Sequence, residues 1–261
     1  MEHFIQLENF KTILPYAQLF EQGLVVTILL SLFTVIIGFV LALLLALMRM
    51  SNVRPFRFLG LDKDGRLRDG GVLLAISKFN PLSFLATAYV EILRSTPVVV
   101  QILIVYFGVF GIISLPRFTL FGFIKFERFF PGVVALGMNS GAYLCEIIRS
   151  GLQSIDGGQT EAARSLGLTQ KQNLRFIILP QAVKNILPAI ANEFVVIIKE
   201  SAITYTIGVQ DIMSAVNAVK GATYIIMEPL LVATAIYFCL CFPTSKIIAY
   251  FERRMSRGDK R

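Results

Sequence analysis

The residues in this sequence that could act in binding or transport are polar groups set inside long apolar stretches. Four of them have types that could line a polar path: Gln101, Asn139, Asn192 and Glu193. A polar group surrounded by apolar material is costly unless it is paired or faces water, so each is a candidate site residue. Glu193 would meet a cationic group. The alternative is that these groups form hydrogen bonds between helices and hold a bundle together.

Four charged residues near this set have the spacing of structural ion pairs. Glu91 and Arg94 are three residues apart and would share a helix face, where they are expected to neutralise each other. Glu146 is expected to pair with either Arg94 or Arg149. These four side chains are therefore interpreted as structural.

Catalytic and metal chemistry find little support. The single histidine, His3, lies in a polar leader, and the cysteines (Cys145, Cys239, Cys241) lie in apolar stretches without disulfide or metal-site spacing. The sequence has no Gly-x-x-x-x-Gly-Lys-Ser/Thr phosphate loop. We expect no enzyme activity, no metal and no cofactor on this chain.

Long apolar runs are the elements that must position these residues. The chain is 55% hydrophobic and only 16% charged, with a mean hydropathy of +0.69. The first run exceeds the ~30 Å hydrocarbon core of a bilayer when helical. The sequence predicts an all-α integral membrane protein, a single domain with five transmembrane helices. The runs cover about residues 24–48, 85–111 (interrupted at Pro97), 131–148, 186–206 and 229–249.

Basic residues predict the orientation. The regions after the first run, after the third run and at the C-terminus hold 17 of the 25 lysines and arginines. Because cytoplasmic loops are enriched in these residues, we expect the N-terminus outside and the C-terminus in the cytoplasm. Residues 51–80 then form an extended cytoplasmic loop with a turn at 62–66. The net charge of +8 reflects topology, and no nucleic-acid partner is expected.

Between the third and fourth runs, the sequence predicts two short helices around a glycine. Thr160 is expected to cap the first helix, and Gly167 to end it in a left-handed conformation. Thr169 and Gln172 have the spacing of a capping box for the second helix, and Pro180 is expected to stop it. On the residues alone, an amphipathic loop resting on the membrane is an equal alternative.

The same loop carries a motif of known type. Its fixed positions are occupied by Glu161, Ala162, Ala163, Gly167, Ile177, Leu179 and Pro180. This pattern resembles the signature loop of permease subunits of bacterial ATP-binding-cassette importers. The stretches Tyr89–Pro97 and Asn139–Glu146 resemble the polar amino-acid uptake branch of that family. Residues 51–80 form a longer loop than the family pattern implies.

The resemblance implies a mechanism and a set of partners. The loop at about 154–182 would be a cytoplasmic coupling helix between spans three and four. It would dock on an ATPase subunit through Glu161, Ala162 and Ala163, with Gly167 setting the angle. Two ATPase subunits would hold ATP and Mg²⁺, with a second permease chain and an extracytoplasmic solute-binding protein completing the complex. A polar amino acid would be carried across the bacterial inner membrane, and its charged ammonium and carboxylate groups suit a path of amides and one carboxylate.

Three other functions remain open at this point. A permease for another small solute would share the loop signature. A secondary transporter or channel would need no ATPase. A membrane-embedded enzyme would need converging catalytic groups, which the spans lack.

Overall fold

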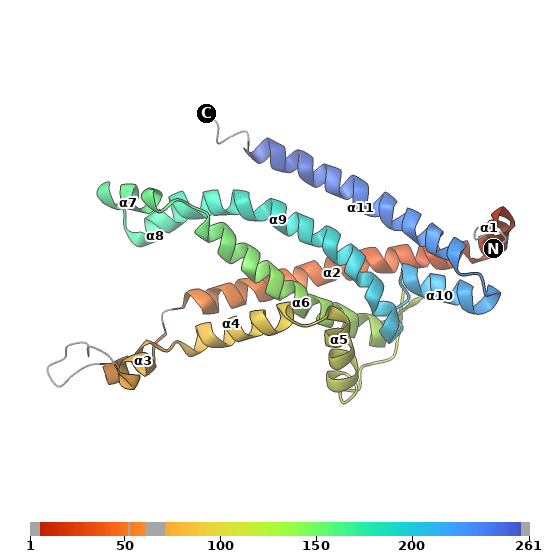
Figure 1. Ribbon diagram of the computed structural model, residues 1–261, viewed down its shortest axis with the longest axis horizontal. Helices are drawn as coiled ribbons and strands as arrows, with labels where there is room; N and C mark the ends of the chain where they lie inside the picture. Colours follow the sequence, from red (N-terminus) through yellow and green to blue (C-terminus); the bar gives the residue numbers. More distant parts are fainter. Residues whose placement is uncertain (1–5, 52, 61–70, 257–261) are drawn as a thin grey trace.

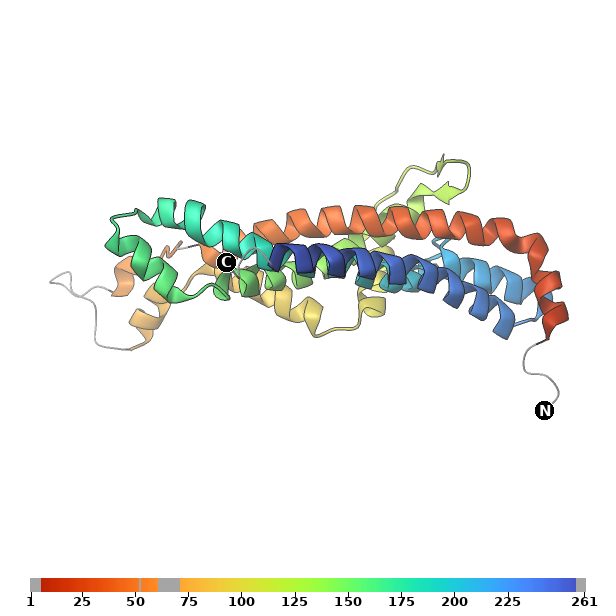
Figure 2. The same cartoon turned by 90° about the horizontal axis from the view of Figure 1, so that it is seen from above.

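The computed structural model describes residues 6–51, 53–60 and 71–256, and it shows an elongated bundle of helices with one small hairpin (Figures 1 and 2). The α-helices are α1 (Leu7–Ile13), α2 (Ala17–Met50), α3 (Val72–Lys78), α4 (Pro81–Arg94), α5 (Val98–Leu103), α6 (Phe126–Gln153), α7 (Gly157–Ser165), α8 (Gln170–Asn173), α9 (Leu179–Glu200), α10 (Ile212–Thr223) and α11 (Met227–Ser256). Short 3₁₀ segments are η1 (Leu14–Tyr16), η2 (Arg57–Gly60) and η5 (Ser201–Ile207), and π-helical turns are η3 (Ile104–Val109) and η4 (Leu174–Ile178). Strands β1 (Thr119–Leu120) and β2 (Ile124–Lys125) pair antiparallel.

The two longest inner helices, α2 and α6, form the centre of the bundle. Glycines on α6 allow this close approach: a Cβ added at Gly141 would lie 2.9 Å from Leu41 Cδ2, and one at Gly137 would lie 3.0 Å from Ile37 Cγ2. Small residues commonly allow such contacts between membrane helices, where van der Waals packing drives association. Helices α4 and α9 pack on the same pair and complete the frame that carries the polar residues.

Two helical stretches of the described chain are long and apolar enough to cross a membrane, Glu8–Met50 and Met227–Met255. A third exists if the pair α3 and α4, bent by 78°, is taken as one span. The expected run at 131–148 lies in α6, and the run at 186–206 lies in α9 and continues into η5; α6 and α9 are long but less apolar. The run at 85–111 is broken after Arg94, and α5 begins directly after Pro97, because proline lacks the amide hydrogen that a continuous helix needs.

Short helices lie at both ends of the bundle. Helices α7, α8 and α3 lie at one end, and α1 and α10 lie at the other (Figure 1). The turn expected at residues 62–66 lies outside the described residues.

Candidate functional site

The loop between α6 and α9 has the predicted two helices, but the first begins earlier than expected. Asp156 caps α7, and its Oδ1 accepts a hydrogen bond from the Gly158 amide at 2.6 Å. The prediction that Thr160 is the cap was wrong, because the Asp156 side chain, about one turn upstream, caps the backbone there. Thr160 instead accepts a hydrogen bond from Asn173 Nδ2 at 3.2 Å, which joins α7 to α8.

The turn between the two helices was predicted correctly. Gly167 has φ +79°, a left-handed conformation that favours glycine. Thr169 and Gln172 form the reciprocal capping box at the start of α8. The prediction that Pro180 stops the second helix was wrong. Pro180 lies in the first turn of α9 directly after the π-turn η4, where a missing amide hydrogen costs little.

The exposed surface of α7 defines what a partner could touch. Glu161 and Ala162 are exposed, whereas Ala163 is only 1% exposed and packs against the chain itself. Of the two alanines, only Ala162 is therefore open to a contact from outside the chain. Leu166 is 80% exposed at the tip of the loop, a contact candidate that sequence reasoning missed. An apolar residue just before the turn glycine was the available signal.

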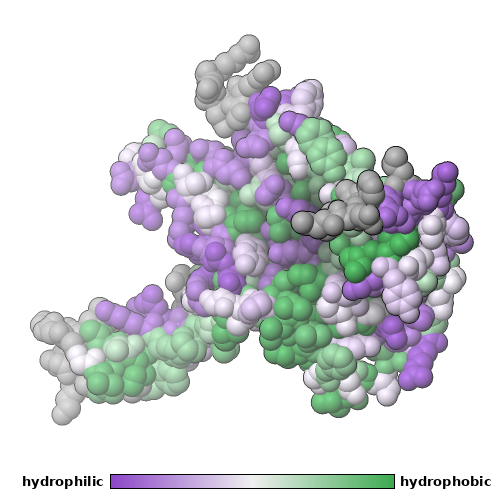
Figure 3. All heavy atoms as spheres, turned by 45° about the vertical axis from the view of Figure 1, so that its right-hand side comes forward, coloured by the Kyte–Doolittle hydropathy of each residue, from purple (hydrophilic) through white to green (hydrophobic). Residues whose placement is uncertain are grey.

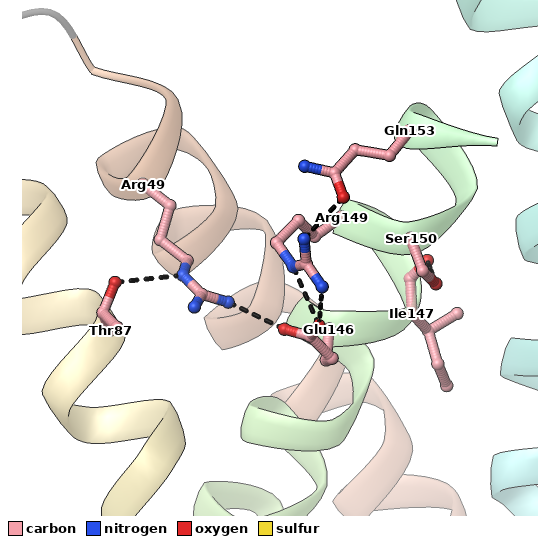
Figure 4. Close-up of polar contacts among 7 residues, drawn as sticks. All are labelled: Arg49, Thr87, Glu146, Ile147, Arg149, Ser150 and Gln153. Atoms are coloured by element: carbon pink, nitrogen blue, oxygen red, sulfur yellow. Dashed lines mark hydrogen bonds and ion pairs between the residues drawn. The ribbon is translucent and has the colours of Figure 1, made fainter. Parts of the chain in front are cut away.

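An ion-pair cluster lies where α6 approaches the loop (Figure 4). Glu146 Oε2 lies 2.8 Å from Arg49 Nη1, and its Oε1 accepts hydrogen bonds from the Arg149 guanidinium. Arg49 Nε also donates to Thr87 Oγ1 at 3.3 Å. Arg149 Nη1 also donates to Gln153 Oε1 at 2.5 Å. This one carboxylate thus ties α2 and, through Arg49, α4 to α6.

Of the two partners considered for Glu146, the structure therefore selects Arg149 and adds Arg49. Arg94 does not reach Glu146, and Glu91 and Arg94 form no ion pair within 4 Å. The Arg94 guanidinium instead lies over the ring of Tyr143, 5.5 Å from its centre. Arg49 was not among the expected partners, because its role depends on how α2 packs on α6.

Gln101 holds the break between α4 and α5. Its Nε2 donates to the carbonyl oxygens of Leu93 (2.8 Å) and Thr96 (3.0 Å) and to Thr96 Oγ1 (2.8 Å). Its Oε1 accepts from Asn139 Nδ2 at 2.9 Å. Gln101, 8% exposed, thereby satisfies carbonyl groups that the broken helix leaves without partners, and Asn139, 4% exposed, donates to the Gln101 side chain.

The other two path candidates lie on α9. Asn192 faces a groove of about 560 Å³ between α9 and α11, and the next residue, Glu193, is buried at 8% exposure. The groove is lined by Lys184, Asn185, Pro188, Ala189, Asn192, Ser245, Ile248, Ala249, Glu252 and Met255. The structure thus brings Gln101 and Asn139 together and places Asn192 in a separate groove, lined by polar and apolar residues in equal number, that sequence reasoning did not identify.

Two comparisons with relatives agree. The chain is 36% identical, over 96% of its length and 99% of the relative, to the arginine transport system permease protein ArtQ of Bacillus subtilis. It is 41% identical, over 71% of its length and 82% of the relative, to the putative glutamine transport system permease protein GlnP of Rickettsia typhi.

Solved structures support the fold. A crystal structure of an amino acid ABC transporter with histidines matches 94% of this chain and 98% of its own, with a TM-score of 0.76 at 38% identity. The MetNI methionine ABC transporter in an inward-facing form has the same fold, with a TM-score of 0.65 at 17% identity. Residues 70–257 match the family described as binding-protein-dependent transport system inner membrane component. This chain therefore belongs to that family and is a permease subunit of an ABC transporter in the inner membrane.

Proposed function

We propose that this chain forms the translocation path of an ATP-driven importer for polar amino acids, together with a second, identical or homologous, permease chain. The observation that carries the proposal is the exposed α7 with its left-handed turn at Gly167, in a chain that is similar to permeases named for arginine and glutamine transport. An extracytoplasmic binding protein would deliver the substrate.

The proposed coupling is mechanical. Two ATPase subunits hold ATP and Mg²⁺, and each receives one α7 through Glu161, Ala162 and Leu166. Ala163 and the Asn173–Thr160 hydrogen bond fasten α7 to the permease, so a movement of the ATPase is transmitted to α6 and α9 rather than absorbed by a loose loop.

The proposed topology has five spans, with the N-terminus outside and α7 in the cytoplasm. The basic residues of the first and third connections and of the tail support this orientation. In this topology α4 and α5 together make the second span, α6 the third and α9 the fourth. Gln101 donates hydrogen bonds to carbonyl groups at the break in the second span, and such groups are costly inside a membrane when they have no partner.

The proposed path uses Gln101, Asn139, Asn192 and Glu193 in two different ways. Gln101 and Asn139 are hydrogen-bonded to each other and stabilise the break between α4 and α5. Asn192 and Glu193 are the groups that would meet the substrate, with the Glu193 carboxylate matched to its ammonium group. Glu193→Gln should reduce uptake while the basal ATPase rate persists, and unchanged uptake with unchanged affinity would remove Glu193 from the path.

The test of the function is reconstitution. The chain is co-expressed with candidate ATPase subunits and a binding protein, and ATP-dependent uptake of radiolabelled arginine and glutamine is measured in proteoliposomes. Glu161→Arg should lower ATPase co-purification and uptake, whereas Glu21→Arg, an exposed acid at the opposite end, should not. Uptake without ATP, or the absence of any co-purifying ATPase, would favour a secondary transporter or channel instead.

A further inference from the structure

The short helix α3 has its apolar side chains on the outside. Val72, Leu73 and Ile76 are 75%, 40% and 38% exposed, whereas the one buried side chain of this helix is Ser77, at 4%. The Ser77 hydroxyl is satisfied internally by donating to the Leu74 carbonyl at 2.7 Å. A helix that turns its serine inward and its aliphatic residues outward is stable only if something apolar covers it.

Neighbouring residues extend the same apolar surface. Val53, Phe56 and Phe58, at 49%, 41% and 66% exposure, lie before or within η2, which packs on α3. Phe79 follows α3 and is 40% exposed. Figure 3 shows hydrophobic surface gathered on the arm at its lower left, which corresponds to the α3 region of Figure 1. Contiguous apolar patches of this kind mark interaction sites rather than ordinary solvent-exposed surface.

The residues that the structure describes in this region carry charges of one sign. Arg54, Arg57 and Lys78 are exposed, and residues 51–60 and 71–80 contain no aspartate or glutamate. Exposed cations beside an apolar face are the composition of a helix that lies at the surface of an anionic bilayer.

The direction of α3 fits the same partner. Its axis is bent by 78° from that of α4. Because α4 runs along α2 and α6 in the bundle, a membrane crossed by the bundle places α3 close to the bilayer plane. In the topology proposed above, α2 and α4 belong to the first two spans, so α3 lies between the end of α2 at Met50 and the start of α4 at Pro81, where both would leave the membrane.

We propose that α3 and η2, with Val53, Phe56 and Phe79, form an interfacial anchor, which inserts its apolar face between the headgroups of the membrane and binds anionic lipid through Arg54, Arg57 and Lys78. In the topology proposed above, this is the cytoplasmic leaflet. The anchor adds a lipid-binding surface to the second span and stands apart from α7, which lies at the same end of the molecule but at another corner (Figure 1).

The experiment places a fluorescent label on the full chain in nanodiscs, without ATPase. The background replaces Cys145, Cys239 and Cys241, and the label is attached at Ile76→Cys or, as the aqueous control, at Lys171→Cys in α8. Brominated phosphatidylcholine reports lipid contact, and iodide reports water contact. We expect brominated lipid to quench the label at residue 76 and not at 171, and iodide to show the reverse. Quenching at 76 should be stronger when the bromine is carried by phosphatidylglycerol than when the same fraction of phosphatidylcholine carries it.

A charge variant tests the second half of the proposal. The triple substitution Arg54→Gln, Arg57→Gln and Lys78→Gln should remove the dependence on phosphatidylglycerol. Each charge that is removed should weaken the preference for anionic lipid by roughly fivefold. Equal iodide quenching at 76 and 171 in every lipid mixture would overturn the proposal. Shielding of residue 76 from both quenchers would also overturn it, because protein would then cover the face. ATP-dependent uptake by the same preparations is measured separately, so failure of the anchor and failure of the transport function are distinguishable.

Discussion

The Glu146 cluster offers a sharp test of how the bundle is held together, through the substitution Glu146→Gln. The glutamine keeps the shape of the side chain but removes the charge that faces Arg49 from α2 and Arg149 from α6. Arg49 is the more sensitive partner, because its side chain is 15% exposed, against 40% for Arg149.

The magnitude follows from these exposures. Removing one partner from a fully buried ion pair costs about 3–5 kcal/mol, because the other charge stays buried without compensation. The residual exposure of Arg49 and Glu146 (21% for Glu146) reduces this penalty. We expect Glu146→Gln to cost about 2 kcal/mol, and Arg149→Gln, at a largely exposed site, ~0.5–1 kcal/mol. In a chain of this length the first corresponds to a drop in Tm of about 4–8 °C.

The assay uses a thiol already in the structure. Cys145, the neighbour of Glu146, is fully buried, while Cys239 and Cys241 are accessible or partly so. With Cys239→Ser and Cys241→Ser, a dye that fluoresces on reaction with thiols reports the opening of the protein around Cys145 during heating in detergent.

Two outcomes would refute this reasoning. One is a shift below about 1 °C for Glu146→Gln. The other is an equal shift for Glu146→Gln and Arg149→Gln, because the burial of Arg49 would then not matter. Arg94→Gln is the matched control, since Arg94 does not reach Glu146.

Further predictions concern single contacts in the loop and the bundle. Gly167→Ala meets no atom within 4 Å, so only left-handed strain of about 1–2 kcal/mol acts, and coupled ATPase activity should fall more than in Gly167→Asn; equal losses would contradict this. Gln101→Leu leaves Asn139 and two carbonyls without partners and should lower the Tm by the equivalent of about 1–3 kcal/mol in the same thiol assay. Gly23→Ala places a Cβ 2.8 Å from the Asp211 carbonyl and should also cost ~1–3 kcal/mol, whereas Gly108→Ala should be nearly silent.

Local chemistry made much of the coupling loop predictable. The left-handed turn at Gly167 and the capping box of Thr169 and Gln172 depend on a few adjacent residues, and the structure confirms both. The cap at Thr160 and the stop at Pro180 were wrong for a related reason. Thr160 could cap a helix or bond to another side chain, and Asn173 engages it in the second way. Pro180 could end one helix or lie in the first turn of the next, and the π-turn before α9 allows the second.

The sequence by itself determined the class of the protein. Apolar runs longer than a soluble core requires, few charges and the loop motif identify a membrane permease without any three-dimensional information. Composition is informative without knowledge of packing, because the bilayer requires apolar side chains on every lipid-exposed turn of a spanning helix.

Only the tertiary structure decided which polar groups meet. Arg49 and Glu146 are far apart in the sequence, and their pairing depends on how α2 and α6 pack, as does the burial of Glu193 beside an open Asn192. The outward apolar face of α3 likewise became visible only in three dimensions. A side chain's partner is set by the register and rotation of packed helices, which arise from many weak contacts over the whole interface, and no short stretch of sequence encodes that sum.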